Sequence, residues 1–394
     1  MSFFTIKKQS LETDLDTEIP QTTTTASQKR PLMRAGIIKT AHGEIETPAF
    51  VGAATCATVK ALTNRHLETI KTPAILVNTY HLLLTPGPEL IAQAGGINKF
   101  TNWQKPTFSD SGGFQMLSLP DAKVDSDGVT FKSHRNGDTI RMTPESSMRA
   151  QWQIGADIHM AFDQAADSRD HSIMKQAMLR THAWLPENLE THELLKHQAE
   201  RDSKPYQSLY AVVQGGLFPD LRQTSAEFMK DQPVDGFGIG SLYTTETPET
   251  AAIIKLTNEI LPVEKPRHLL GMGSEPRDLF LGVLYGCDTF DCVGPTRLAR
   301  NGALYSKTGR INIKNAKYRD YFAPLDETCP CELCQNHTLA YLHHLFKTDE
   351  ITGKILATIH NETFVIDLMQ KIRQSIQDDT FGSLMTNFMN SYYN

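Results

Sequence analysis

The chain has 394 residues, of which 40% are hydrophobic and 21% are charged, a composition typical of a soluble globular enzyme with one or two domains. Its formal net charge of −6 excludes a general polyanion binder, so nucleic-acid binding would require a local basic patch. No apolar run reaches the ~18 residues of a membrane span, and the N-terminus lacks the order of a secretory signal. We therefore expect a cytoplasmic protein without a membrane partner.

The first 32 residues are expected to form a flexible N-terminal segment. Residues 10–30 contain few apolar side chains and a threonine tract, a composition typical of a flexible insertion. The short run "FFTI" before this insertion is apolar enough to pair as a β-strand.

Short β-prone runs alternate with helical patterns from residue 46 onward. Continuous apolar strands separated by helices predict a parallel sheet that is covered on both faces. Eight such units within residues 33–302 fit a (β/α)8 barrel, and a doubly wound open sheet is the alternative. The expected strands lie at 47–54, 74–80, 106–112, 157–163, 208–216, 236–241, 267–273 and 289–293.

Two segments interrupt this alternation. Residues 122–143 place Asp-Gly and Asn-Gly between β-type runs, which predicts antiparallel hairpins inserted after the third strand. Residues 303–394 follow the eighth strand and contain helical patterns at 339–347 and 362–376. We expect this tail to form a metal-binding subdomain with helices that close the barrel.

Polar residues follow most of the expected strands, at the end where barrel enzymes carry their active sites. Solvation alone also places polar residues at strand ends, but three aspartates that converge there favour a catalytic site. The strand-end residues are Asn78, Asp110, Asp163, Gln214, Ser241, Gly273 and Asp291.

Three of the six cysteines are clustered in the motif C-x-C-x-x-C, formed by Cys329, Cys331 and Cys334. They lie too close together for a sensible disulfide framework and predict a metal site. A Cys3His set suits structural zinc, which leaves no open position for chemistry. The fourth ligand could be His360, returning on a helix, and His337, His343 and His344 are competitors that lie closer in sequence.

Three strand-end motifs carry groups suited to a purine-like ligand. The pair Gly112 and Gly113 in "SDSGGFQ" allows a tight turn that brings the backbone close to a ligand. Asp163 offers two acceptors for adjacent N–H groups, although a helix N-cap would look the same. The side-chain amide of Gln214 offers one hydrogen-bond donor and one acceptor, and the glycine-rich turn at 238–242 offers free backbone N–H groups.

The stretch "TFDCVGPTRLARNG" at 289–302 offers two candidate nucleophiles, Asp291 and Cys292. Adjacent strand residues point to opposite faces, so we expect Cys292 to pack away from the site that Asp291 faces. Residues 296–321 contain several basic residues and only one acid, Asp320. This local excess of positive charge could be a solvated surface or a patch that binds nucleic acid. The basic residues are Arg297, Arg300, Lys307, Arg310, Lys314, Lys317 and Arg319.

The ordered set of motifs resembles the tRNA-guanine transglycosylases, also called queuine tRNA-ribosyltransferases. The matching motifs are "SDSGGFQ", "FDxxxD", "VVQGG", "FDCVxPTRxARNG" and "CxCxxC…H", supported by "TxHGxIxTPAF", "NTYHLLLxPG" and "INIKNAKY". The resemblance extends from about Met33 to the C-terminus, and the order of so many motifs makes it highly specific.

The resemblance implies a homodimeric (β/α)8 barrel with one structural zinc ion per subunit. It implies exchange of guanine 34 in tRNAs with G-U-N anticodons (Asp, Asn, His and Tyr) for a 7-deazaguanine base, within queuosine modification. Asp291 would be the nucleophile of a double displacement, and Asp110 the general acid and base.

The resemblance also assigns binding roles, position by position. The base pocket would be formed by Asp110, Ser111, Gly112, Gly113, Phe114, Asp163, Gln214, Ser241 and Leu242. RNA contacts would come from Met272, Gly273, Ser274, Arg277, Asp278, Thr296, Arg297 and Arg300. The zinc ligands would be Cys329, Cys331, Cys334 and His360.

Several positions depart from the bacterial pattern. Gln164 and Ala165 stand where Glu and Cys are usual, and Ser274 replaces a usual lysine. In "GSLYTTE", Ser241, Tyr243 and Thr244 differ from the usual "GGLAVGE", whereas Glu246 is retained. Two of these changes fall where the 7-substituent of the incoming base would lie, so they leave preQ1, queuine and preQ0 open as that base. The retained Glu246 and the otherwise family-typical pattern favour preQ1.

Two other functions compete with this reading. A non-catalytic RNA-binding subunit would keep the barrel and the zinc site but lose the aspartates, and Asp110, Asp163 and Asp291 are all present here. A zinc-dependent barrel hydrolase is disfavoured because the expected metal ligands lie together outside the strand ends.

Overall fold

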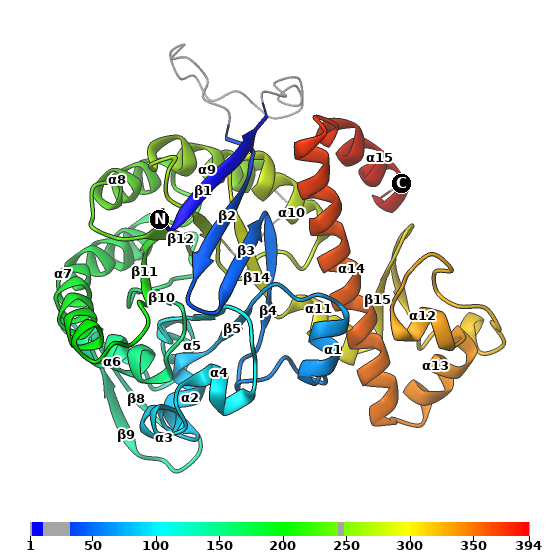
Figure 1. The fold of residues 1–394 in the computed structure, drawn as a ribbon, viewed down its shortest axis with the longest axis horizontal. Coiled ribbons are helices and arrows are strands. Elements are labelled where there is room, and N and C mark those ends of the chain that lie inside the picture. Colours follow the sequence, from blue (N-terminus) through cyan, green and yellow to red (C-terminus); the bar gives the residue numbers. More distant parts are fainter. Residues whose placement is uncertain (1, 11–31, 243–247, 394) are drawn as a thin grey trace.

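The computed structural model describes residues 2–10, 32–242 and 248–393, and its core is a closed barrel of eight parallel strands (Figure 1). Every expected strand is present, in the closed order β10-β11-β12-β13-β14-β4-β5-β6. The strands are β4 (Ala49–Ala53), β5 (Ile75–Val77), β6 (Thr107–Ser109), β10 (Ile158–Met160), β11 (Ser208–Val213), β12 (Gly236–Ile239), β13 (Arg267–Leu269) and β14 (Thr289–Cys292). The closure confirms the (β/α)8 prediction and rules out the open doubly wound sheet.

The helices surround this barrel and continue into the C-terminal region. Those within the barrel portion are α1 (Asn64–Thr69), α2 (Thr79–Leu84), α3 (Pro88–Gln93), α4 (Ile97–Thr101), α5 (Gly113–Leu117), α6 (Pro144–Ile154), α7 (His171–Arg201), α8 (Pro219–Met229), α9 (Pro248–Ile260), α10 (Pro276–Leu284) and α11 (Gly294–Arg300). The later ones are α12 (Glu332–Asn336), α13 (Leu339–Lys347), α14 (Ile351–Gln377) and α15 (Phe381–Tyr393). In the part of the chain that is described, none is long and apolar enough to cross a membrane.

A three-stranded antiparallel sheet covers the N-terminal end of the barrel. It consists of β1 (Phe4–Gln9), β2 (Arg34–Thr40) and β3 (Gly43–Thr47), so the expected strand at "FFTI" is confirmed. Phe4, Ile38 and Ile45 share one apolar cluster with the inward-facing residues of the barrel strands. The predicted insertion at residues 10–30 lies almost entirely outside the described residues.

The interruptions predicted after the third and eighth strands are both present. β7 (Lys123–Val124), β8 (Val129–Lys132) and β9 (Thr139–Met142) form an antiparallel sheet within the predicted 122–143 insertion. After β14 come the hairpin β15 (Ala303–Ser306) and β16 (Gly309–Asn312), then the short 3-10 helix η2 (Ala316–Tyr318). The long helix α14 then returns along the side of the barrel, where it packs against β4, α11, α12 and α13 (Figure 1).

Candidate active site and metal centre

Asp110 directly follows β6 and is held by donors from its own turn and from the junction between β5 and α2. Its Oδ1 accepts from the backbone N–H of Thr79 at 2.9 Å and of Gly112 at 3.1 Å. The side-chain amide of Asn78 donates to Oδ2. Burial, together with the negative charge of Asp291, raises the pKa of Asp110 to about 7 against the lowering effect of these donors. A carboxyl group with this pKa can both donate and accept a proton near neutrality.

Asp291 lies in β14, where its side chain is 13% exposed. Its Oδ1 accepts from the backbone N–H of Gly271 at 2.9 Å and lies 3.1 Å from Nε2 of His268. Among the residues that the structure describes, no hydrogen bond reaches Oδ2. One oxygen of Asp291 is thus anchored and the other is available to a ligand.

Cys292 does not share this environment, as the alternation along the strand predicts. Its thiol is buried in the apolar cluster that includes Phe290 and Tyr305. Burial raises the pKa of Cys292 to about 12, and the nearby Asp291 charge adds to this. Because the thiolate is the reactive form of cysteine, this residue is a poor nucleophile.

Asp163 and Gln214 form one hydrogen-bonded unit with Ser111. Ser111 Oγ donates to Asp163 Oδ1 at 2.9 Å, and Gln214 Nε2 donates to Asp163 Oδ2 at 2.6 Å. Burial raises the pKa of Asp163 to about 6. Gln214 Oε1 is buried and has no hydrogen-bond partner among the described residues. A buried acceptor of this kind favours a ligand with an N–H group.

Two backbone features shape the walls around this unit. A Cβ atom at Gly113 would lie 2.5 Å from the carbonyl oxygen of Asp163, so only glycine allows this approach. Ser241 adopts a left-handed conformation with φ of 54°, and its Oγ accepts from the backbone N–H of Ala166 at 3.1 Å. This bond joins the turn after β12 to the loop after β10. Tyr243, Thr244 and Glu246 lie outside the described residues.

Two further predicted pocket residues, Phe114 and Leu242, differ in exposure. Phe114, at the start of α5, is 48% exposed, whereas Leu242 is buried. Gln164 is fixed from α7, because Arg180 donates to its side-chain oxygen and its backbone N–H donates to Thr181 Oγ1 at 3.0 Å.

The predicted RNA-binding residues divide by exposure. Arg277 and Arg297 are exposed, and Arg300 and Ser274 are partly buried. Arg277 lies over the ring of Tyr393 at 4.3 Å from its centroid, a contact that sequence reasoning missed. The remaining four are buried: Met272, Gly273, Asp278 and Thr296. Thr296 donates its hydroxyl to the Val293 carbonyl, and Asp278 accepts from the Glu275 N–H at the start of α10.

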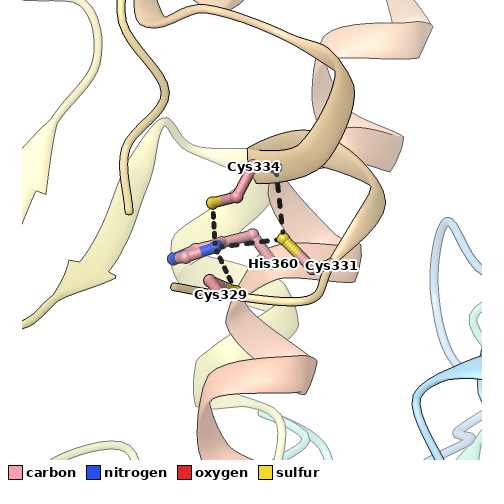
Figure 2. A group of neighbouring side chains, drawn as sticks. All are labelled: Cys329, Cys331, Cys334 and His360. Carbon is pink, nitrogen blue, oxygen red and sulfur yellow. Dashed lines mark hydrogen bonds between the residues drawn. The ribbon is translucent and has the colours of Figure 1, made fainter. Parts of the chain in front are cut away.

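The three clustered cysteines meet His360 of α14 (Figure 2), in the C-terminal region that lies beside the barrel (Figure 1). The ligand atoms of all four residues lie within 4.8 Å of one another. Nδ1 of His360 faces the sulfurs, at 3.4 Å from Cys331 and Cys334 and 3.8 Å from Cys329, while its Nε2 contacts the Tyr305 carbonyl at 2.7 Å. Three soft thiols and one imidazole can hold a metal ion, and the outer hydrogen bond fixes the ring orientation.

The competing histidines do not join this cluster. Nδ1 of His343 contacts the carbonyl of Ile313 at 2.7 Å, and the ring of His337 packs beside Tyr341. The group that could hold a metal in the described residues contains neither of them, nor His344. Because the cluster is filled by four protein ligands outside the strand ends, it does not support a zinc-dependent hydrolase.

A closed barrel with differently held carboxyl groups at its strand ends defines an enzyme of the (β/α)8 class. The family model described as queuine tRNA-ribosyltransferase matches residues 29–394 of the chain. The chain therefore belongs to the queuine tRNA-ribosyltransferase family, and it is a pentosyltransferase by class.

Curated relatives support the same membership over nearly the whole chain. A queuine tRNA-ribosyltransferase of Herpetosiphon aurantiacus is 47% identical over 362 residues, covering 91% of this chain and 90% of the relative. One from Dehalococcoides mccartyi is 43% identical, covering 93% and 91%. One from Halothermothrix orenii is 42% identical, covering 92% and 95%.

Proposed function

We propose that this enzyme replaces guanine 34 in tRNAs with G-U-N anticodons, those for Asp, Asn, His and Tyr, by a 7-deazaguanine base. The observation that carries the proposal is the pairing of Asp110, whose pKa is raised to about 7, with Asp291, which has one anchored and one available oxygen. Two carboxyl groups held in different environments suit substitution at a glycosidic carbon. A non-catalytic subunit would have no use for such a pair.

In the first displacement, Oδ2 of Asp291 attacks C1′ of the target ribose. The bond from C1′ to N9 of guanine breaks, and its electron pair leaves with the base. Asp110 supplies the proton that makes the departing guanine neutral. The product is an ester between Asp291 and the ribose, and Asp110 is left as a carboxylate.

In the second displacement, Asp110 removes the N9 proton of the incoming base. N9 then attacks C1′ while the bond from C1′ to Oδ2 of Asp291 breaks. Two inversions retain the stereochemistry at C1′, and both carboxyl groups return to their starting states. The same site therefore requires no external proton donor over the whole cycle.

The target base must leave its stack to reach this site. We assign its guanine-like edge to Asp163, to Gln214 and to the backbone at Ser241 and Leu242, with stacking on Phe114. The partnerless Oε1 of Gln214 and the exposed ring of Phe114 support this assignment. Ser111, Gly112 and Gly113 hold the near wall of the pocket.

We assign contacts with the RNA backbone to the arginines Arg277, Arg297 and Arg300. Guanidinium groups contact phosphates without reading sequence, so these residues would add affinity. The buried residues Met272, Gly273, Asp278 and Thr296 would act indirectly, together with Ser274, by shaping residues 272–278 and the first turn of α11.

The incoming base is preQ1 in this proposal, in preference to queuine. Its 7-substituent would lie beside Ala165, where a hydrogen bond between Ser241 and Ala166 ties the two walls together. Because this hydrogen bond restrains both sides of the pocket, the site favours a small 7-substituent over the bulkier one of queuine. We further propose one structural zinc ion bound by Cys329, Cys331, Cys334 and His360, and a homodimer in the cytoplasm.

The test combines base exchange with trapping of the covalent intermediate. Guanine-labelled tRNA is incubated with the enzyme and chased separately with preQ0, preQ1 and queuine. We expect preQ1 to release the label at a lower concentration than preQ0 or queuine does. In denaturing gels, wild type and Cys292→Ser should give an RNA adduct, whereas Asp291→Asn should give none. An adduct in Asp291→Asn would refute the nucleophile, and no label release by any base would refute the function.

A further inference from the structure

His268 is a buried side chain in contact with the proposed nucleophile, and the mechanism above does not use it. It lies in β13 and is 0% exposed. Its Nε2 lies 3.1 Å from Asp291 Oδ1 and its Nδ1 lies 2.8 Å from Thr289 Oγ1. The ring also packs against Phe108, with centroids 5.3 Å apart and planes inclined by 30°. The imidazole is therefore fixed from three sides.

The contacts of His268 define the direction of its hydrogen bonds. An ionised carboxylate only accepts, so Nε2 must carry the proton that points to Asp291. In a neutral ring, Nδ1 then accepts from the Thr289 hydroxyl. The backbone N–H of Gly271 supplies a second donor to the same oxygen, at 2.9 Å. Both donors converge on Oδ1, which leaves Oδ2 as the attacking atom.

We infer that His268 is a positioning residue that, with Gly271, stabilises the carboxylate of Asp291 when it leaves C1′ in the second displacement. The inference rests on the double displacement proposed above. As the bond from C1′ to Oδ2 breaks, its electron pair returns to the carboxyl group and is shared with Oδ1. Donors already aimed at Oδ1 stabilise that developing charge, as an oxyanion hole does.

The two displacements should therefore depend on His268 to different extents. In the first displacement, the carboxylate of Asp291 loses charge as it attacks. A donor on Oδ1 then orients the carboxylate but also stabilises the reactant, so it gives little net acceleration. In the second, the carboxylate gains charge, and the same donor lowers the barrier. A residue needed only for folding would affect both steps alike.

The test measures the two steps separately in His268→Phe and His268→Gln. Phenylalanine keeps a ring against Phe108 but has no N–H, whereas glutamine keeps a side-chain donor. Enzyme in excess is mixed with radiolabelled tRNA, and adduct formation is followed in denaturing gels. The adduct is then chased with guanine to follow its breakdown. We expect His268→Phe to break down its adduct roughly 10- to 100-fold more slowly than wild type, the size for a hydrogen bond to a charged group.

The supporting result is an adduct that forms at nearly the wild-type rate and accumulates in His268→Phe, with an unchanged KM for tRNA. His268→Gln should recover at least part of the breakdown rate. Thr289→Val, which frees the imidazole to turn, should slow breakdown by roughly 3- to 10-fold, the size for a neutral hydrogen bond. If His268→Phe does not fold, the breakdown rate of the Thr289→Val adduct tests the inference instead.

Wild-type breakdown in His268→Phe and Thr289→Val would overturn the inference, and so would equal slowing of both steps. If wild type itself forms no adduct and exchanges no guanine, the proposed function has failed instead. The two failures are thus distinguished by the wild-type arm alone.

Discussion

The acid–base chemistry of Asp110 is strongly perturbed by its surroundings. Two backbone N–H groups and the Asn78 amide favour its carboxylate, yet burial and the charge of Asp291 outweigh them and raise its pKa to about 7. The group therefore carries its proton at pH 6 and has largely lost it at pH 8. In the mechanism that we propose, the first displacement needs the protonated form, because guanine leaves with that proton.

We expect the rate of adduct formation in single turnover to fall as pH rises through about 7, approaching tenfold per pH unit above it. Asp110→Asn should form adduct roughly 10²- to 10⁴-fold more slowly, with no inflection near this pH. The measurement is adduct formation on denaturing gels between pH 6 and 9. A wild-type rate that stays constant across that range would contradict the assignment of Asp110 as the acid.

Sequence reasoning located most of these residues because each follows or ends an apolar run. Asp110, Asp163 and Asp291 stand at strand ends, and the choice of Asp291 over Cys292 follows from alternation along one strand. His268 was missed because a histidine inside "RHLLGMG" has the pattern of a core residue. Its contact with Asp291 depends on the register of β13 against β14, in which His268 lies opposite Thr289.

At the scale of elements, all the expected strands are present, but several are shorter than predicted. Residues 106–112 were expected as one strand, whereas β6 ends at Ser109. The backbone N–H of Asp110 still donates to the Val77 carbonyl at 3.2 Å, but Gly112 then turns the chain with a left-handed φ of 79° into α5. The side chain of Asp110 accepts from the N–H groups of Thr79 and Gly112 at this turn. The turn that ends β6 therefore also carries Asp110 into the candidate site.

The turn after β12 illustrates a link between elements that sequence alone does not reveal. Ser241 holds a positive φ of 54°, which costs a side chain about 1–2 kcal/mol and costs glycine little. Its hydroxyl compensates by accepting from the Ala166 N–H at 3.1 Å. The strain and the bond together make this position a test of how the two pocket walls are held.

We expect Ser241→Ala to raise the KM for the incoming base by roughly 2- to 10-fold, because it loses a hydrogen bond worth about 0.5–1.5 kcal/mol and keeps the strain. Ser241→Gly is the matched control, since it loses the same bond and relieves the strain. It should show a similar KM and a higher Tm than the alanine variant. The measurements are base-exchange kinetics and thermal unfolding. An unchanged KM in both variants would contradict a role for the link.

At the scale of the whole molecule, distant segments are joined by contacts that no local pattern specifies. Arg34 of β2 and Asp288, just before β14, form an ion pair at 2.6 Å with both side chains 0% exposed. Breaking one partner of such a pair typically costs about 3–5 kcal/mol. Sequence predicts the barrel from its repeated pattern, but it does not indicate that residues 254 positions apart are paired.

The same limit applies to α14, which supplies His360 to the metal cluster and packs against β4 and α11 of the barrel. The helix was predicted from its amphipathic pattern at 362–376, yet it begins at Ile351 and carries the histidine at its centre. A metal ion in the cluster would tie α12 and the preceding loop to this helix. Its loss should therefore weaken the attachment of residues 303–347 to the barrel.

We expect Cys331→Ala to lower the zinc content from about one ion per chain to nearly none, because three ligands no longer close the site. The same variant should lower Tm by at least about 5 °C, the shift for a loss of a few kcal/mol. Cys56→Ala is the control, since Cys56 is exposed and lies outside the cluster. Metal analysis and thermal unfolding are the measurements. Stoichiometric zinc in Cys331→Ala would refute the ligand set, whereas zinc loss with an unchanged Tm would show that the metal does not hold the subdomain to the barrel.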